Sequence, residues 1–168
     1  RTVERVLRRA ISGAGVEGQL AGLRALIDLD SVTYAAEKLE AIAADEAINE
    51  EFRLVALELI GMTEEPDAED ALLELLVSYN PKIKLAAARA LWRLDTPNSH
   101  RAKVALREFL QSADPELQAQ GALTLAEIGD ADTPGLTDIL LRLRREPGMR
   151  GQLADALWKK LQLQRTIQ

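Results

Sequence analysis

The sequence predicts an all-α protein, an α-α superhelix of about five stacked helix pairs. Leu and Ala supply 29 and 26 of the 168 residues, and both are strong helix formers. Aromatic residues make up only 4% of the chain, so the core must be aliphatic. The chain also repeats itself at intervals of a little over thirty residues, which is the signature of stacked helical repeats.

The first helix of each repeat is predicted from five stretches that share one pattern. They span residues 18–29, 52–62, 83–94, 117–128 and 150–161. One column holds large aliphatic residues at intervals of 34, 31, 34 and 32, namely Leu26, Ile60, Leu91, Leu125 and Leu157. Four positions earlier stand Gly22, Ala56, Ala87, Gly121 and Leu153. Large and small residues one turn apart indicate a helix packed closely against its neighbours.

A second helix is predicted after each of the first four, over residues 32–44, 68–79, 99–111 and 135–146. Its shared column is Leu39, Leu72, Leu106 and Leu140, at intervals of 33, 34 and 34. The repeats therefore cover about 16–47, 48–80, 81–113 and 114–146 of a single domain spanning 1–168. Residues 1–12 and 147–168 form half repeats. We expect the chain to be a segment of a longer protein.

Capping residues and helix breakers fall at the predicted boundaries. Asn80-Pro81 and Asp114-Pro115 place an N-cap residue before a proline at the first helical position. Asn49 is the expected cap of the second repeat, and Pro134 is expected to open the second helix of the fourth.

These features resemble HEAT repeats, a family of armadillo-like solenoids. The motifs that carry the resemblance are Asn80-Pro81-Lys82-Ile83-Lys84 and Asp114-Pro115-Glu116-Leu117-Gln118, together with the Gly129-Asp130 turn. The bacterial repeats of the phycobilisome-lyase type are the most similar branch. The resemblance covers residues 16–161 and implies a right-handed superhelix whose second helices line a concave wall.

Composition limits the possible chemistry. Cysteine is absent and His100 is the single histidine, which excludes thiolate and multi-histidine metal sites. A nucleophilic triad needs a positioned base, usually a histidine, and His100 is the one histidine that could serve. His100 is interpreted as an exposed turn residue beside a capping Ser99. Missing cysteine is compatible with a reducing, cytoplasmic location, and no apolar run is long enough to span a membrane.

Two further features have a structural explanation. Residues 63–70 concentrate five carboxylates, including Glu69, which we expect to be exposed. They lack the spacing of a calcium loop and suit a helix N-terminus. Trp92 and Trp158 occupy one repeat column with Ile27, Gly61 and Ala126, which indicates packing between repeats rather than base stacking.

Charge is distributed unevenly along a chain of net charge −6. Residues 13–80 hold 3 basic and 16 acidic residues, whereas residues 81–112 hold 7 basic and 2 acidic ones. Such fields orient charged partners, and Lys103 and Arg107 lie one turn apart on the basic repeat. An acidic segment of a protein partner is the ligand expected there.

The function expected from these observations is a non-catalytic scaffold that binds a protein or peptide through the concave second helices, without cofactor or metal. The candidate partner-binding residues are Glu37, Glu40, Asp70, Leu73, Val77, Lys103, Arg107, Gln111, Leu141 and Arg145. A phycobilin-lyase-like or other enzyme-associated subunit is the alternative that the resemblance implies. A DNA-binding HEAT-like protein ranks third, because phosphate binding needs clustered Lys and Arg rather than a net negative charge.

Overall fold

The computed structural model describes residues 2–167, and the side chains of these apart from 165 and 167. The described residues form ten α-helices and one 3₁₀ turn, without a β-strand. The predicted all-α class is therefore confirmed. Arg1 and Gln168, the ends of the two half repeats, lie outside the described residues. The helices group into two compact units, divided between Ala102 and Lys103.

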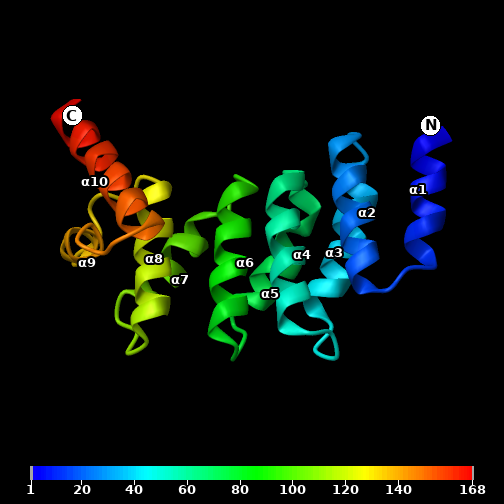
Figure 1. The fold of residues 1–168 in the computed structure, drawn as a ribbon, viewed down its shortest axis with the longest axis horizontal. Helices are drawn as coiled ribbons and strands as arrows, with labels where there is room; N and C mark the ends of the chain where they lie inside the picture. The colour runs from blue at the N-terminus through cyan, green and yellow to red at the C-terminus, as the bar shows by residue number, and fades with distance from the viewer. Residues whose placement is uncertain (1, 168) are drawn as a thin grey trace. The chain divides into compact units, whose positions relative to one another are not determined.

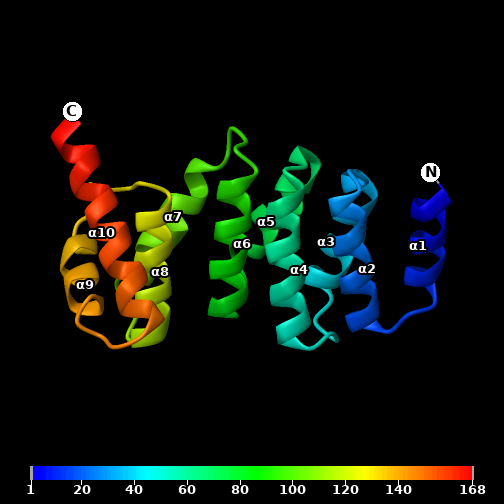
Figure 2. The same ribbon diagram turned by 45° about the horizontal axis from the view of Figure 1, so that its top comes forward.

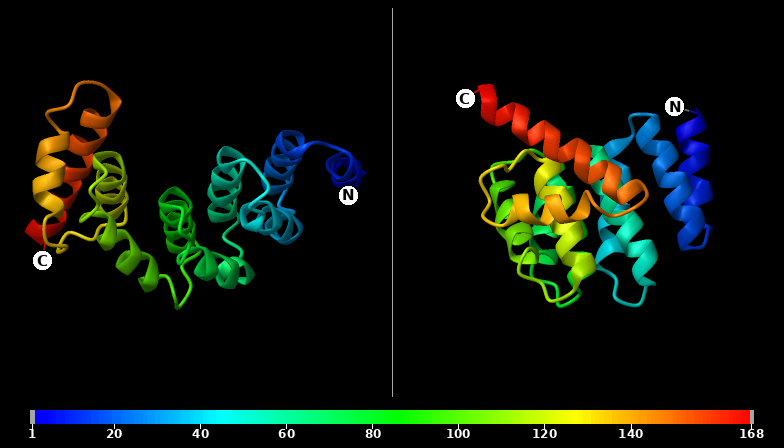
Figure 3. Two further views of the ribbon diagram at one scale, coloured as in Figure 1. Left: turned by 90° about the horizontal axis from the view of Figure 1, so that it is seen from below. Right: turned by 60° about the vertical axis from the view of Figure 1, so that its left-hand side comes forward.

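The first unit is built from two layers of helices. Its elements are α1 (Thr2–Ser12), α2 (Val16–Asp28), α3 (Val32–Ala44), α4 (Glu50–Thr63), η1 (Pro66–Ala68), α5 (Glu69–Leu75) and α6 (Pro81–Arg93). The helices α2, α4 and α6 stand side by side in one layer (Figure 1). The helices α3 and α5 pack on one side of that layer (Figure 3). Helix α2 contacts α3 and α4, helix α4 contacts α3 and α6, and α5 packs against α6.

The second unit begins inside α7 (His100–Phe109) and contains α8 (Pro115–Glu127), α9 (Leu136–Leu143) and α10 (Met149–Ile167). Helices α8, α9 and α10 all contact one another (Figure 2). The alternation of longer and shorter helices matches the predicted order of first and second helices.

Both predicted columns form the core of these units. The residues with no exposed surface include Leu26, Ile60, Leu91, Leu125, Leu39, Leu72, Leu106 and Leu140. Leu157 retains 8% exposure. The column of small residues marks the points of closest approach. A Cβ atom added to Gly121 would lie 2.6 Å from Cβ of Phe109, and one added to Gly22 would lie 2.5 Å from Cγ1 of Ile11. Only a residue without a side chain fits at such distances.

The fifth member of the small-residue column behaves differently. Leu153 is 42% exposed, whereas its counterpart Gly121 is buried. Gly151 of α10 is also tightly placed, since an added Cβ would lie 2.0 Å from the carbonyl oxygen of Glu146, in the turn that leads into the same helix. Ala154 and Leu157 of α10 are buried, so the inward column is kept although Leu153 is exposed.

The predicted N-caps are confirmed. The side-chain oxygens of Asn49, Asn80 and Asp114 accept hydrogen bonds from the amides of Glu51, Lys82 and Glu116 at 2.8, 3.0 and 2.8 Å. The prediction for Pro134 is wrong by two residues, because Gly135 adopts the left-handed region at φ +82° and α9 starts at Leu136. Ser99 does not cap α7 as expected, since its buried hydroxyl donates to the carbonyl of Leu91 at 3.0 Å.

Two second helices are shorter than predicted. Helix α5 ends at Leu75, not near residue 79, because the chain must leave the helical conformation before Asn80-Pro81. Helix α9 ends at Leu143, and Gly148 turns the chain at φ +87°.

Replacing Leu91 with Ala tests the inward column. Leu91 is fully buried, so Leu91→Ala should lower the free energy of unfolding by about 2–5 kcal/mol. The matched control is Leu29→Ala, because Leu29 is 51% exposed and its truncation should cost less than about 1 kcal/mol. Chemical denaturation followed by circular dichroism measures both values. Equal losses would contradict the assignment of the core.

Candidate functional site

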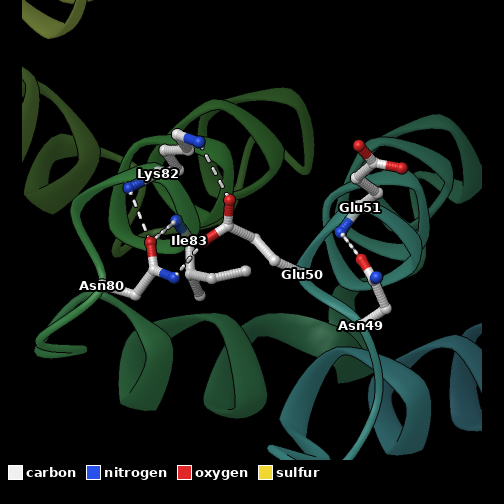
Figure 4. A network of polar contacts seen from close by, with 6 residues as sticks. All are labelled: Asn49, Glu50, Glu51, Asn80, Lys82 and Ile83. Atoms are coloured by element: carbon white, nitrogen blue, oxygen red, sulfur yellow. Dashed lines mark hydrogen bonds and ion pairs between the residues drawn. The ribbon is translucent and has the colours of Figure 1, made fainter.

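The charged residues at the starts of the first helices hold consecutive repeats together. In the first unit, Glu50 of α4 accepts hydrogen bonds from the side-chain nitrogens of Asn80 at 2.5 Å and Lys82 at 3.0 Å (Figure 4). Asn80 is also the N-cap of α6, so one carboxylate holds the cap of the next repeat in place. The bond from Asn80, followed by that from Lys82, keeps the pKa of Glu50 below its ordinary value.

The second unit repeats this contact 66 residues further on, counted from Glu50 to Glu116. Glu116 of α8 forms an ion pair with Arg150 of α10 at 2.5 Å and accepts a hydrogen bond from Gln120 at 2.8 Å. The bond from Gln120 is the main cause of the lowered pKa of Glu116, and the bond from Arg150 adds to it. These charges serve the stacking of repeats, so we do not assign them to a partner.

Glu69 belongs to the same class, which corrects the expectation that it is exposed. It is half-buried, and its carboxylate accepts hydrogen bonds from the hydroxyl of Thr96 and from the amide of Asn98, the latter at 3.2 Å. The bond from Thr96 is the main cause of its lowered pKa. Glu69 thus ties α5 to the turn after α6. In the part of the chain that the structure describes, no three His, Cys, Asp or Glu side chains are grouped to hold a metal ion.

Four other carboxylates of the first unit come together at the junction of α3 with η1. Burial is the main cause of the raised pKa of Glu40, and the charges of Glu37, Asp67 and Glu65 raise it further. Glu65 accepts a hydrogen bond from the hydroxyl of Thr33 at 2.8 Å, which links the two elements. This concentration of negative charge follows from the tertiary structure, because residues 37–40 and 65–67 are far apart in the sequence.

The predicted partner-binding residues are divided between the two units. In the first unit, Glu37, Asp70 and Val77 are exposed, and Glu40 and Leu73 are half-buried. Val77 is 76% exposed. Helix α3 packs against both η1 and α5, so these five residues lie on neighbouring elements.

In the second unit, Arg107, Gln111, Leu141 and Arg145 are exposed and Lys103 is half-buried. Arg107 is engaged within the protein. Its Nε and Nη2 atoms donate to the two carboxylate oxygens of Asp130 at 3.0 and 2.9 Å, and Nε also lies 2.9 Å from the hydroxyl oxygen of Thr133. Arg107 therefore joins α7 to the turn between α8 and α9.

Sequence reasoning identified Gly129-Asp130 as a turn but missed the partner of Asp130. The side chain of Asp130 is only 9% exposed, and it also accepts a hydrogen bond from Thr133. The signal was present in part, since Asp and Thr three residues apart are typical of a turn closed by side chains. The arginine that completes the network stands 23 residues earlier, and its role follows only from the structure.

His100 is exposed as predicted, and the two tryptophans are partly buried. Trp92 and Trp158 are half-buried, and the guanidinium of Arg144 lies 4.2 Å from the ring centre of Trp158. Arg144 also pairs with Asp155 at 2.6 Å, so this aromatic ring is covered from within the second unit. His100 is exposed, with Nδ1 at 2.9 Å from the carbonyl oxygen of Pro97.

Comparison of the sequence with models of known protein families and with curated proteins finds no match. Among the described residues, no helix is both long and apolar enough to cross a membrane.

Asp130→Asn tests the turn network. Removing the carboxylate charge weakens the paired hydrogen bonds of Arg107, so unfolding of the second unit should become easier by about 1–3 kcal/mol. Asp132→Asn is the matched control, since Asp132 is exposed in the same turn and should change stability little. Thermal unfolding of both variants gives the comparison. Equal stability of the two would show that the pair contributes nothing.

Glu40→Gln tests the acidic junction of α3. Because the pKa of Glu40 is raised in the folded state, its ionised form destabilises the fold at neutral pH. This penalty decreases as the pH falls through the folded pKa and is absent when the carboxyl is protonated in both states. The variant should therefore be more stable than the wild type at pH 7 and equally stable at about pH 3, below the pKa of the unfolded state. Glu58→Gln, at an exposed position of α4, should show no such difference. Denaturation at the two pH values measures it, and a stabilisation of Glu40→Gln that is independent of pH would contradict the explanation.

Proposed function

We propose that this protein is a non-catalytic helical-repeat scaffold that binds a protein partner through the outward faces of its second helices. The observation that carries the proposal is the division of three second helices, α5, α7 and α9, into a buried and an exposed side. Leu72, Leu106 and Leu140 are fully buried, whereas Val77, Val104 and Leu141 are 76, 55 and 37% exposed on or just after the same helices. Exposed aliphatic residues beside charged ones are typical of protein-binding surfaces.

The resemblance of the sequence to HEAT repeats supports the proposal. The resemblance implies a superhelix whose second helices line a concave wall. The hydrogen-bonded caps and the alternation of first and second helices agree with such repeats. The motif residues are occupied with packing and capping, so a partner would contact the residues between them. The absence of cysteine is compatible with a reducing compartment, so we propose a cytoplasmic location.

The experiment replaces the exposed aliphatic residues and measures partner binding. The triple variant Val77→Glu, Val104→Glu and Leu141→Glu should lower affinity for a crosslinked or co-purified partner at least ~10-fold, because three apolar contacts are lost. The control is Leu29→Glu, at a 51% exposed apolar residue that ends a first helix, and it should bind normally. Circular dichroism should show equal helicity in all proteins.

Three results would contradict the scaffold proposal. Equal affinity of the partner for the wild type and the triple variant would mean that the partner binds another surface. Absorbance of the purified protein beyond the aromatic band would indicate a bound chromophore and favour the enzyme-associated alternative. Tight, salt-dependent binding of duplex DNA would favour the nucleic-acid alternative.

A further inference from the structure

The second helix of the second repeat has an outward face that mixes apolar and acidic side chains. Asp70, Leu73, Glu74 and Val77 follow the helical spacing i, i+3, i+4 and i+7, and we call them the α5 face. The chain stays close to helical geometry beyond the end of α5, since the amide of Leu76 donates to the carbonyl of Leu72 at 3.1 Å. The other side of this segment is buried at Leu72 and Leu76.

The apolar part of the α5 face is more exposed than core-forming residues of this type usually are. Val77 is 76% exposed, and Tyr79 is fully exposed two residues further on. Leu73, which belongs to α5 itself, is half-buried. An aliphatic pair with an aromatic ring beside it can cover the apolar side of an incoming helix or extended segment. The ring of Tyr79 can also stack with a guanidinium group.

The charge around the α5 face decides which partner fits. Residues 63–80 contain six acidic residues and no basic one. Helix α3, which packs against η1 and α5, adds Glu37 and Glu40. Of the three basic residues in the stretch 13–80, Arg53 is buried and donates to the carbonyl of Ala43 at 2.8 Å, whereas Arg24 and Lys38 are exposed. Against 16 acidic residues, these three leave the stretch strongly negative. Lys38 lies 5.8 Å from the ring centre of Tyr34.

The basic residues of the stretch 81–112 are partly paired with carboxylates of the protein itself. The basic stretch 81–112 contains Lys82 and Arg107, and these pair with Glu50 and Asp130 at 3.0 and 2.8 Å. An acidic partner would have to compete with these carboxylates. At the α5 face, Asp70 and Glu74 are exposed, so a cationic partner can pair with their carboxylates.

We infer that the α5 face, with Glu37 and Glu40 of α3, binds a cationic amphipathic segment of a partner protein. The apolar side chains of the partner segment cover Leu73 and Val77, and its Lys or Arg side chains face the carboxylates around them. Nucleic acids and anionic membranes are excluded from this surface by charge repulsion. The inference rests on the proposed function and specifies the partner chemistry for the first unit.

The test uses two labelled peptides of equal length, an amphipathic Leu/Lys peptide and the same peptide with Glu in place of every Lys. Fluorescence anisotropy measures their dissociation constants at low and physiological salt. The Leu/Lys peptide should bind, with affinity falling as salt is added, and the Leu/Glu peptide should bind at least ~10-fold more weakly.

Paired charge reversals separate a defined surface from general attraction to a negative protein. Glu37→Lys with Glu74→Lys should weaken binding of the Leu/Lys peptide ~10-fold or more. Glu46→Lys with Glu58→Lys changes the net charge equally at exposed residues outside the α5 face, and should weaken it less than ~2-fold. Val77→Ser should weaken binding several-fold without altering the salt dependence. If a charge-reversed variant loses helicity, Glu37→Gln with Glu74→Gln replaces it.

Equal weakening by the two charge-reversed pairs, or no binding of the Leu/Lys peptide, would overturn the inference. So would a dimer in sedimentation equilibrium that Glu37→Lys with Glu74→Lys dissociates, because the occupant would then be a second copy. The scaffold proposal is tested separately, since Val104→Glu and Leu141→Glu act on the second unit. If Val104→Glu and Leu141→Glu abolish partner binding but the Leu/Lys peptide does not bind the wild type, the scaffold proposal stands and the inference of a cationic partner is refuted.

Discussion

Close packing between stacked helices is the constraint on which the rest of this structure depends. No helix pair here carries enough apolar surface to form a core alone, so each pair must bury its faces against its neighbours. Gly61 of α4 shows how near they come, since an added Cβ would lie 3.1 Å from Cα of Ala90 in α6. The aliphatic column can then fill the remaining space without large aromatic side chains, which the composition almost lacks.

Polar contacts at the helix ends set the register of this packing. Contacts between Glu50 and Lys82, and between Glu116 and Arg150, span 32 and 34 residues, which is the length of one repeat. Each joins the start of one first helix to the start of the next. As these groups are exposed or half-exposed, each contributes little energy individually. Their value lies in fixing which turn of one helix meets which turn of the next, because apolar packing alone is tolerant of sliding.

The electrostatic character of the surface depends on which charged side chains are already paired within the protein. By sequence, the basic stretch 81–112 was the natural place for a charged partner. In the structure Arg107 is shared with Asp130 and Thr133, and its role there is to hold a turn. The acidic residues of the first unit instead accumulate at the contact of α3 with η1, where they raise the pKa of Glu40. A partner of positive charge relieves this repulsion, which is why the two units need not recognise the same chemistry.

The sequence by itself determined the helical class, the repeat length, the inward columns and the N-caps at Asn49, Asn80 and Asp114. These features are local or periodic, so a single chain records them directly. Only the tertiary structure decided the roles of Glu69, Arg107 and Leu153. The partners of Glu69 and Arg107 stand 27 and 23 residues away, outside any local pattern. The sequence therefore predicts only surface charges at these two positions. Leu153 occupies a buried column by repeat alignment but is 42% exposed, although Ala154 and Leu157 of the same helix are buried. Long-range contacts of this kind depend on where helices finally meet, and spacing along the chain does not specify that.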